Sequence, residues 1–126
     1  MLEYKTRAAG DVTILDLQGR ISVAEAIAFG PGSGTVLAEV IRDLANKGHR
    51  KILLNLKGVP YMDSSGMGDL VRSLTSLRRM GGELKLMNPT TALLELLCIT
   101  HLDKVFAIER DEASAVQSFA HRAAVS

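Results

Sequence analysis

The chain has 126 residues, which is long enough for one domain with a sizeable buried core. Hydrophobic residues make up 47% of it and charged residues 23%, a composition typical of an ordinary soluble globular domain. Fifteen basic residues against fourteen acidic ones leave a net charge of +1, so no strong overall field favours nucleic acid or an anionic membrane. We therefore expect a single domain over residues 1–126 whose partners are selected by local surface features.

The sequence also carries indications of location. Glu3, Lys5 and Arg7 occupy the N-terminal stretch where a signal peptide would need apolar residues. No segment approaches the roughly 20 apolar residues that cross a bilayer. The single cysteine, Cys98, excludes an internal disulfide and fits a reducing compartment, and its apolar surroundings, "LLELLCI", predict a small buried side chain. We expect a cytoplasmic protein without membrane insertion.

The first half of the chain begins with two strands. Apolar and polar residues alternate over residues 2–8 and 11–19, and a turn between them predicts an antiparallel pair. Residues 21–34 are interrupted by glycine and proline, which predicts a loop with at most a helical turn before it. From residue 35 apolar residues recur every three or four positions, so we expect a helix that ends at Gly48.

The second half alternates strands and helices. The apolar run at 51–56 predicts a strand buried on both faces, and a helix follows that ends at Gly81 and Gly82. Next come a strand at 83–88, a helix from Pro89 to about Ile99 with proline in its first turn, a short strand at 104–109 and a helix at 111–123. This order predicts an α/β fold: a mixed sheet of about five strands, antiparallel at one edge, with about four helices.

The stretch "YMDSSGMGDL", residues 61–70, lies where the buried strand leads into the second helix. Free backbone N–H groups gather at such a junction, and Asp63 or Ser64 can cap the helix there. Capping does not account for the serine pair or for Gly66 and Gly68, since glycine costs roughly 1 kcal/mol relative to alanine within a helix. Glycine does permit close approach of another backbone or of a bulky anion.

The spacing of these residues does not match the known patterns of catalytic, phosphate-binding or metal-binding sites. A hydrolase elbow, G-x-S-x-G, would need glycine where Met62 and Asp63 stand, and the three histidines are scattered without the context of a general base. The glycine-rich "GPGSGTV" lacks the lysine of a phosphate-binding loop, and one cysteine with distant histidines offers no metal-ligand spacing. We therefore predict no catalytic residue, no metal and no cofactor, and we do not expect an enzyme.

A third interpretation is that Ser64 or Ser65 accepts a phosphoryl group. The added charge of about −1.5 to −2 would sit at a helix N-terminus, whose dipole tolerates an anion, so the fold can survive the modification. Together with Asp63 it would repel an acidic or closely packed partner.

The segment "KILLNLKGVPYMDSSGMGDLVRSLTSLRRMGGELKLMNPT", residues 51–90, resembles the STAS domain family, and closely its small bacterial anti-sigma factor antagonists. The resemblance rests on the D-S-S-G-x-G core, the apolar strand before it and the helix closed by G-G. The element order matches over nearly all of the chain.

What the resemblance implies is a switch between partners. In the family, the unphosphorylated antagonist binds an anti-sigma factor that is also a serine kinase, which frees a sigma factor. The kinase phosphorylates the first serine after the aspartate, here Ser64 with Ser65 as second choice, and a phosphatase of the PP2C class restores the antagonist. ATP and metal belong to those partners.

The resemblance also implies which residues contact the partner, namely Asp63, Ser65, Gly66, Met67 and Gly68. Met62 and Met67 are expected to pack mainly against the core. Asn55 matches a polar position in the preceding strand, where it either satisfies neighbouring backbone groups or contacts a partner. The connection 21–34 is longer and more apolar than is usual in the family, where a short connection carries polar residues that help partner docking.

Two other functions stay open at this point. STAS-like modules also serve as scaffolds or regulatory subunits of stress-sensing and transport assemblies, in which residues 24–29 would form an interface and the chain could be a homo-oligomer. An enzyme or small-ligand binder would use the same strand-to-helix corner, but no set of residues in the chain supports it.

Overall fold

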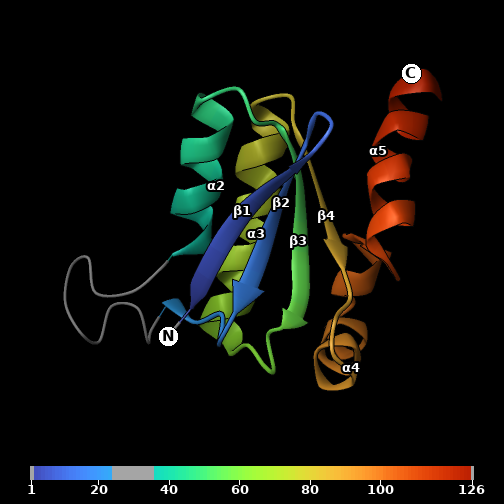
Figure 1. The fold of residues 1–126 in the computed structure, drawn as a ribbon. Coiled ribbons are helices and arrows are strands. Elements are labelled where there is room, and N and C mark those ends of the chain that lie inside the picture. Colours follow the sequence, from blue (N-terminus) through green and yellow to red (C-terminus); the bar gives the residue numbers. More distant parts are fainter. Residues whose placement is uncertain (1, 24–35, 126) are drawn as a thin grey trace.

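The computed structural model describes residues 2–23 and 36–125, with side chains up to residue 119. Within these residues five strands form one sheet in the order β1-β2-β3-β4-β5 (Figure 1). The strands are β1 (Glu3–Ala9), β2 (Val12–Gln18), β3 (Lys51–Gly58), β4 (Glu83–Met87) and β5 (Ala107–Glu109). β1 pairs antiparallel with β2, whereas β2 to β5 are parallel, so the predicted antiparallel edge is confirmed.

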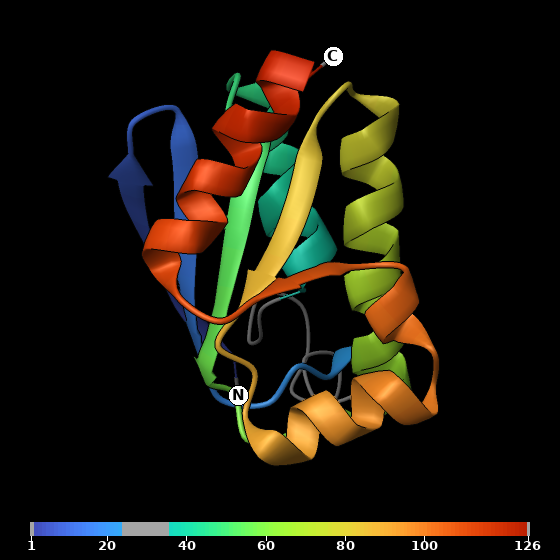
Figure 2. The ribbon, with the colours of Figure 1, turned by 90° about the vertical axis from the view of Figure 1, so that its right-hand side faces the viewer.

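The helices lie on both faces of this sheet. They are α2 (Leu37–Asn46), α3 (Ser64–Arg79), α4 (Thr91–Ile99) and α5 (Glu112–Val125), with a 3₁₀ turn, η1 (Leu102–Lys104). Figures 1 and 2 show α2 and α3 side by side on one face, α5 on the opposite face, and α4 beyond the carboxyl ends of β3 and β4. The predicted mixed α/β fold with about five strands and four helices is confirmed for the described residues.

β3 is buried on both faces, as its apolar run predicts. Leu54 belongs to the large core that the sheet forms with α2, α3 and α4, whereas Leu53 packs against Phe119 of α5 on the other side. Because successive side chains of a strand point to opposite faces, a strand between two helical layers needs apolar residues at consecutive positions.

Two predicted elements in the second half begin later than their patterns suggest. Pro89 does not enter α4, because Thr90 caps the helix by accepting a hydrogen bond from the Leu93 N–H group at 3.2 Å. The strand expected at 104–109 is shorter than predicted, since β5 begins only at Ala107. The N–H groups of Val105 and Phe106 donate to the carbonyl of Leu102, so the residues before β5 form a turn.

The prediction of a buried Cys98 is wrong, because the side chain is exposed. α4 turns Leu93 and Leu97, four residues apart, into the core. Cys98 follows Leu97 directly and therefore faces away from the core, on a helix that is covered on one side. The apolar run predicts the helix but not which of its residues are buried.

Candidate functional site

The predicted site lies where β3 leads into α3, at the carboxyl end of the parallel strands, toward the bottom of Figure 1. Met62 is fully buried, and it pairs with Ile21 through an isolated parallel bridge. The chain leaving β2 therefore runs beside the chain entering α3. This pairing brings Ser22 next to Asp63, although the two residues are 41 positions apart in the sequence.

Asp63 is the N-cap of α3 and has three hydrogen-bond donors. Its Oδ1 accepts from the Gly66 N–H group at 2.8 Å and from the Ser65 hydroxyl at 2.6 Å, while its Oδ2 accepts from the Ser22 hydroxyl at 2.5 Å. These donors, Ser22 first among them, lower the pKa of Asp63 to about 2, because each favours the ionised carboxylate. The carboxylate is charged at neutral pH and is directed toward the end of β2.

The two serines of the motif differ in exposure and in bonding. Ser64, the first residue of α3, is exposed, and its hydroxyl makes no hydrogen bond to any residue that the structure describes. Ser65 is half-buried, donates to Asp63 and lies with its Oγ 3.5 Å from the Oγ of Ser22. The geometry therefore presents Ser64 to the surface and directs Ser65 inward.

The two glycines that the sequence singled out have different surroundings. A Cβ on Gly66 would lie 1.8 Å from the carbonyl oxygen of Ile21, so only glycine lets α3 approach the chain that leaves β2. A Cβ on Gly68 would meet only the guanidinium of Arg72, at 3.3 Å. Gly66 is thus required inside the protein, and the predicted contact of both glycines with a partner stays a prediction.

The two methionines beside the serines differ in burial. Met62 is in the core, as expected, whereas Met67 is half-buried and packs against the core from its edge. Part of the Met67 side chain therefore remains available to a partner, together with exposed Ser64.

Sequence reasoning missed two residues that organise this region, Ser22 and Asp69. Asp69 lies on α3 and is 1% exposed, and its carboxylate accepts hydrogen bonds from the N–H groups of Leu37 at 2.8 Å and Ala38 at 2.9 Å. It therefore satisfies the first turn of α2 from a neighbouring helix. Burial raises the pKa of Asp69, and the two N–H donors oppose that rise. An acid on the buried face of α3, one residue before Leu70, was the available signal.

Asn55 is explained by contacts within the protein. Its Nδ2 donates to Asp16 at 2.8 Å, and its Oδ1 accepts from the Lys57 N–H group at 3.2 Å. Asp16 is also paired with Arg7, which bonds Glu112 at the start of α5. The bond to Lys57 confirms that Asn55 satisfies a neighbouring backbone group, and its contact with a partner stays a prediction.

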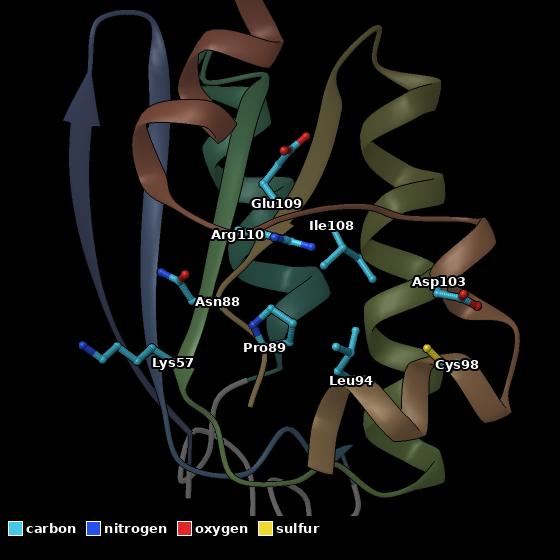
Figure 3. A pocket seen from close by; sticks show the side chains of 9 residues that line it. All are labelled: Lys57, Asn88, Pro89, Leu94, Cys98, Asp103, Ile108, Glu109 and Arg110. Atoms are coloured by element: carbon cyan, nitrogen blue, oxygen red, sulfur yellow. The ribbon is translucent and has the colours of Figure 1, made fainter. Parts of the chain in front are cut away.

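A separate cleft of about 710 Å³ opens beside α4 and β5 (Figure 3). Its lining includes the cations Lys57 and Arg110, the acids Asp103 and Glu109, and apolar side chains such as Leu94. No residue of the 61–70 stretch lines it. The mixture of charges singles out no ligand class, and the cleft adds nothing to the small-ligand hypothesis.

Two further searches concern only the described part of the chain. No group of three or more histidine, cysteine, aspartate or glutamate side chains is placed to hold a metal ion there. None of the helices described is both long enough and apolar enough to span a membrane. The connection 21–34 and the expected interface at 24–29 fall largely or wholly outside the described residues.

The sequence model of the STAS domain matches residues 3–115, and the chain belongs to this family. Among curated proteins, the anti-sigma-B factor antagonist of Bacillus subtilis is 36% identical over 85 residues, which are 68% of this chain and 77% of that protein. The family assignment thus agrees with the resemblance that the motif predicted.

Solved structures share the fold. A Thermotoga maritima protein described as a candidate anti-sigma factor antagonist superposes with a TM-score of 0.76 at 27% identity, covering 91% of this chain and 92% of that one. The Bacillus cell fate determinant SpoIIAA, solved in its phosphorylated form, has a TM-score of 0.63 at 17% identity, over 93% and 99% of the two chains. At that identity the likeness to SpoIIAA concerns the fold alone.

Proposed function

We propose that the protein is an anti-sigma factor antagonist that works by switching partners. Without phosphate it binds an anti-sigma factor that is also a serine kinase, and phosphorylation of Ser64 releases it. The observation that carries this proposal is the arrangement at the start of α3, where the Ser64 hydroxyl is exposed while Asp63 and Ser65 are bonded inward. The relatives described as anti-sigma factor antagonists support the same conclusion.

The position of Ser64 suits a group that must accept charge without unfolding the domain. Ser64 is the first helical residue of α3, where the positive end of the helix dipole favours an anion. A phosphate of about −1.5 to −2 charge can therefore be carried there with the backbone unchanged. Its effect falls on whatever molecule covers this surface.

Release of the partner would follow from adding charge next to the carboxylate of Asp63. Asp63 is ionised, with a pKa of about 2, so phosphorylation of Ser64 places a second anionic group beside the first. A partner that fits closely over Ser64 and the exposed part of Met67, or that presents acids there, would meet steric and like-charge repulsion. Asp63, Ser65, Gly66, Met67 and Gly68 remain the proposed contact region.

The chemistry requires little from this chain beyond the hydroxyl. In the transfer, the Ser64 Oγ forms a bond to the γ-phosphorus of ATP, the bond between that phosphorus and the departing ADP breaks, and the hydroxyl proton passes to a base of the kinase. A metal-dependent phosphatase of the PP2C class would return the serine by hydrolysis. ATP and metal are supplied by these partners.

The test uses a candidate anti-sigma serine kinase from the same organism, chosen by gene neighbourhood or recovered by a pull-down with this protein. Incubation with that kinase and ATP, followed by mass spectrometry, should place one phosphate on Ser64, and Ser64→Ala should abolish it. Ser114→Ala is a matched control, since Ser114 is also exposed and lies in the first turn of a helix. The N–H group of Ser114 donates to Asp111, an aspartate three residues earlier in the chain. Unmodified Ser64 after efficient turnover of the kinase would refute the proposal.

A second candidate function is that of a scaffold subunit in a larger assembly. The observation that favours it is the presence of three exposed apolar side chains on and after α4, where Ile99 is 76%, Val105 43% and Leu94 40% exposed. Size-exclusion chromatography with light scattering separates the two functions. A stable large homo-oligomer would favour the scaffold, whereas a monomer that binds the kinase favours the antagonist.

A further inference from the structure

Ser22 lies just after the end of β2, and the backbone holds its side chain against Asp63. The preceding residue, Ile21, pairs with Met62, and its carbonyl lies against Gly66 so closely that no Cβ fits between them. Ser22 itself is 7% exposed. The hydroxyl is therefore fixed inside the site, facing the carboxylate that caps α3.

Ser22, Asp63 and Ser65 form one hydrogen-bonded group. The Ser22 hydroxyl donates to Oδ2 of Asp63 at 2.5 Å, and the Ser65 hydroxyl donates to Oδ1 at 2.6 Å. The two serine oxygens are 3.5 Å apart. Since both carboxylate oxygens are engaged, the side chain of Asp63 cannot turn without breaking at least one bond to a charged acceptor.

This group treats the two adjacent serines differently. A phosphate on Ser65 would lie beside the ionised carboxylate of Asp63 and against buried Ser22, whereas a phosphate on Ser64 points outward. Asp63 is also too weak a base to activate Ser65, because its pKa of about 2 is far from neutral pH. The hydrogen bond therefore restrains the Ser65 hydroxyl and does not prepare it for reaction.

We propose that Ser22 is a positioning residue for phosphoryl transfer, which fixes Asp63 and thereby keeps the Ser65 hydroxyl inside the site and leaves Ser64 as the acceptor. This role rests on the proposed function. Without the Ser22 hydroxyl, Oδ2 of Asp63 loses this donor while Oδ1 keeps its bond to the Gly66 N–H group, so the carboxylate, and the Ser65 hydroxyl bonded to it, are held less firmly. Ser65 then competes with Ser64 for the γ-phosphoryl group of ATP.

The experiment compares full-length wild-type protein with Ser22→Ala, Ser22→Thr and Ser73→Ala. Each is incubated with ATP and the candidate kinase used to test the proposed function, and mass spectrometry measures the phosphate on Ser64 and on Ser65. In Ser22→Ala the ratio of Ser65 to Ser64 phosphate should rise by about tenfold, a factor within the range expected for a hydrogen bond to an ionised group. Ser22→Thr keeps a hydroxyl and should restore the wild-type ratio.

Ser73→Ala is the matched control, because Ser73 is a fully buried serine of α3 whose hydroxyl bonds the backbone carbonyl of Asp69 at 2.8 Å, away from Asp63. It should leave the ratio unchanged even if it lowers stability. Should Ser22→Ala fail to fold, Ser22→Cys, whose thiol is somewhat larger and a weaker donor, provides the same test without leaving a cavity.

The outcomes separate the two proposals. If Ser64 is phosphorylated in the wild type and Ser22→Ala or Ser22→Cys gives the same ratio, the role of Ser22 is overturned and the proposed function stands. If the kinase phosphorylates neither serine in the wild type, the proposed function fails, and the role of Ser22 fails with it.

Discussion

Two aspartates, one at the N-cap of α3 and one within the helix, each cap a helix, but in opposite environments. Asp63, at the surface end of the helix, caps α3 itself and binds the hydroxyls of Ser22 and Ser65. Asp69, six residues further on, is buried and caps α2 through the N–H groups of Leu37 and Ala38. The pKa of Asp63 is lowered to about 2 by its donors, whereas burial raises the pKa of Asp69.

The difference shows how one helix serves both stability and signalling. Where water still reaches the carboxylate, hydrogen bonds dominate its energetics and the charge is retained beside Ser64, the proposed acceptor. Where water is excluded, the cost of desolvation dominates, and the same side chain serves mainly to join two helices. Substitutions at both aspartates and at their neighbours on α3 can therefore separate the two roles.

The stability of the N-terminal end of α3 should depend most on the close approach of Gly66 to the backbone of Ile21. Gly66→Ala should lower the free energy of unfolding by about 3 kcal/mol or more, because the new Cβ would lie 1.8 Å from the carbonyl oxygen of Ile21 and the helix must shift. Gly68→Ala is the matched control and should change it by no more than about 1 kcal/mol, since only the flexible side chain of Arg72 is near. Urea unfolding measures both, and equal effects would contradict the contrast.

The buried aspartate is expected to matter next. Asp69→Asn should lower the free energy of unfolding by about 2 kcal/mol, because the amide can accept from only one of the Leu37 and Ala38 N–H groups and leaves the other unsatisfied. Hydrogen exchange at those two amides should accelerate in the variant. Asp63→Asn provides the comparison at the surface, and a larger loss there than at Asp69 would reverse our ranking.

The two carboxylates should also give opposite responses to pH. A folded pKa below the unfolded value means that the stability from Asp63 is present above about pH 4 and is lost as the pH falls toward about 2. For Asp69, whose folded pKa is raised, the contribution is present below about pH 4 and is lost as the pH rises through the folded pKa.

Urea unfolding at a series of pH values measures how the free energy of unfolding changes with pH. The part of that change due to each aspartate should disappear when that aspartate is replaced by asparagine. Asp63→Asn should remove the loss of stability that occurs as the pH falls below about 4. Asp69→Asn should remove the loss of stability that occurs as the pH rises through the folded pKa of Asp69. Carboxyl carbon NMR titration assigns each pKa directly, and an unshifted Asp63 would argue against the three-donor arrangement.

The smallest effect on stability is expected at the proposed acceptor. Ser64→Asp should change the free energy of unfolding by less than about 0.5 kcal/mol, because an anion is tolerated in the first turn of a helix. It should nevertheless reduce affinity for the anti-sigma kinase, measured by calorimetry, since charge is the proposed signal. Ser64→Asn, similar in size but neutral, controls for bulk, and equal losses in the two variants would show that charge is not the cause.

Local pattern was sufficient for most of the fold. The consecutive apolar residues of β3 and the spaced leucines of α3 predicted a buried strand and an amphipathic helix, since burial on one or two faces leaves a period in the sequence. The same reasoning erred at Cys98, because an apolar run does not reveal which side of α4 is covered.

The site was predicted only in part, for the same reason. Asp63 as a cap and two adjacent serines at a helix start can be read from neighbouring positions. The partners of Asp63 and Asp69 cannot, because Ser22 and Leu37 are 41 and 32 residues away along the chain. The spacing of a motif carries no information about such partners.

Thus the sequence alone determined the order of strands and helices, the position of the serine motif at a strand-to-helix junction and the resemblance to the STAS family. Tertiary structure decided which serine faces outward, why Gly66 must be glycine and how α3 is joined to α2. These depend on packing β2, β3 and two helices against one another, and side chains distant in sequence meet only when that packing is complete.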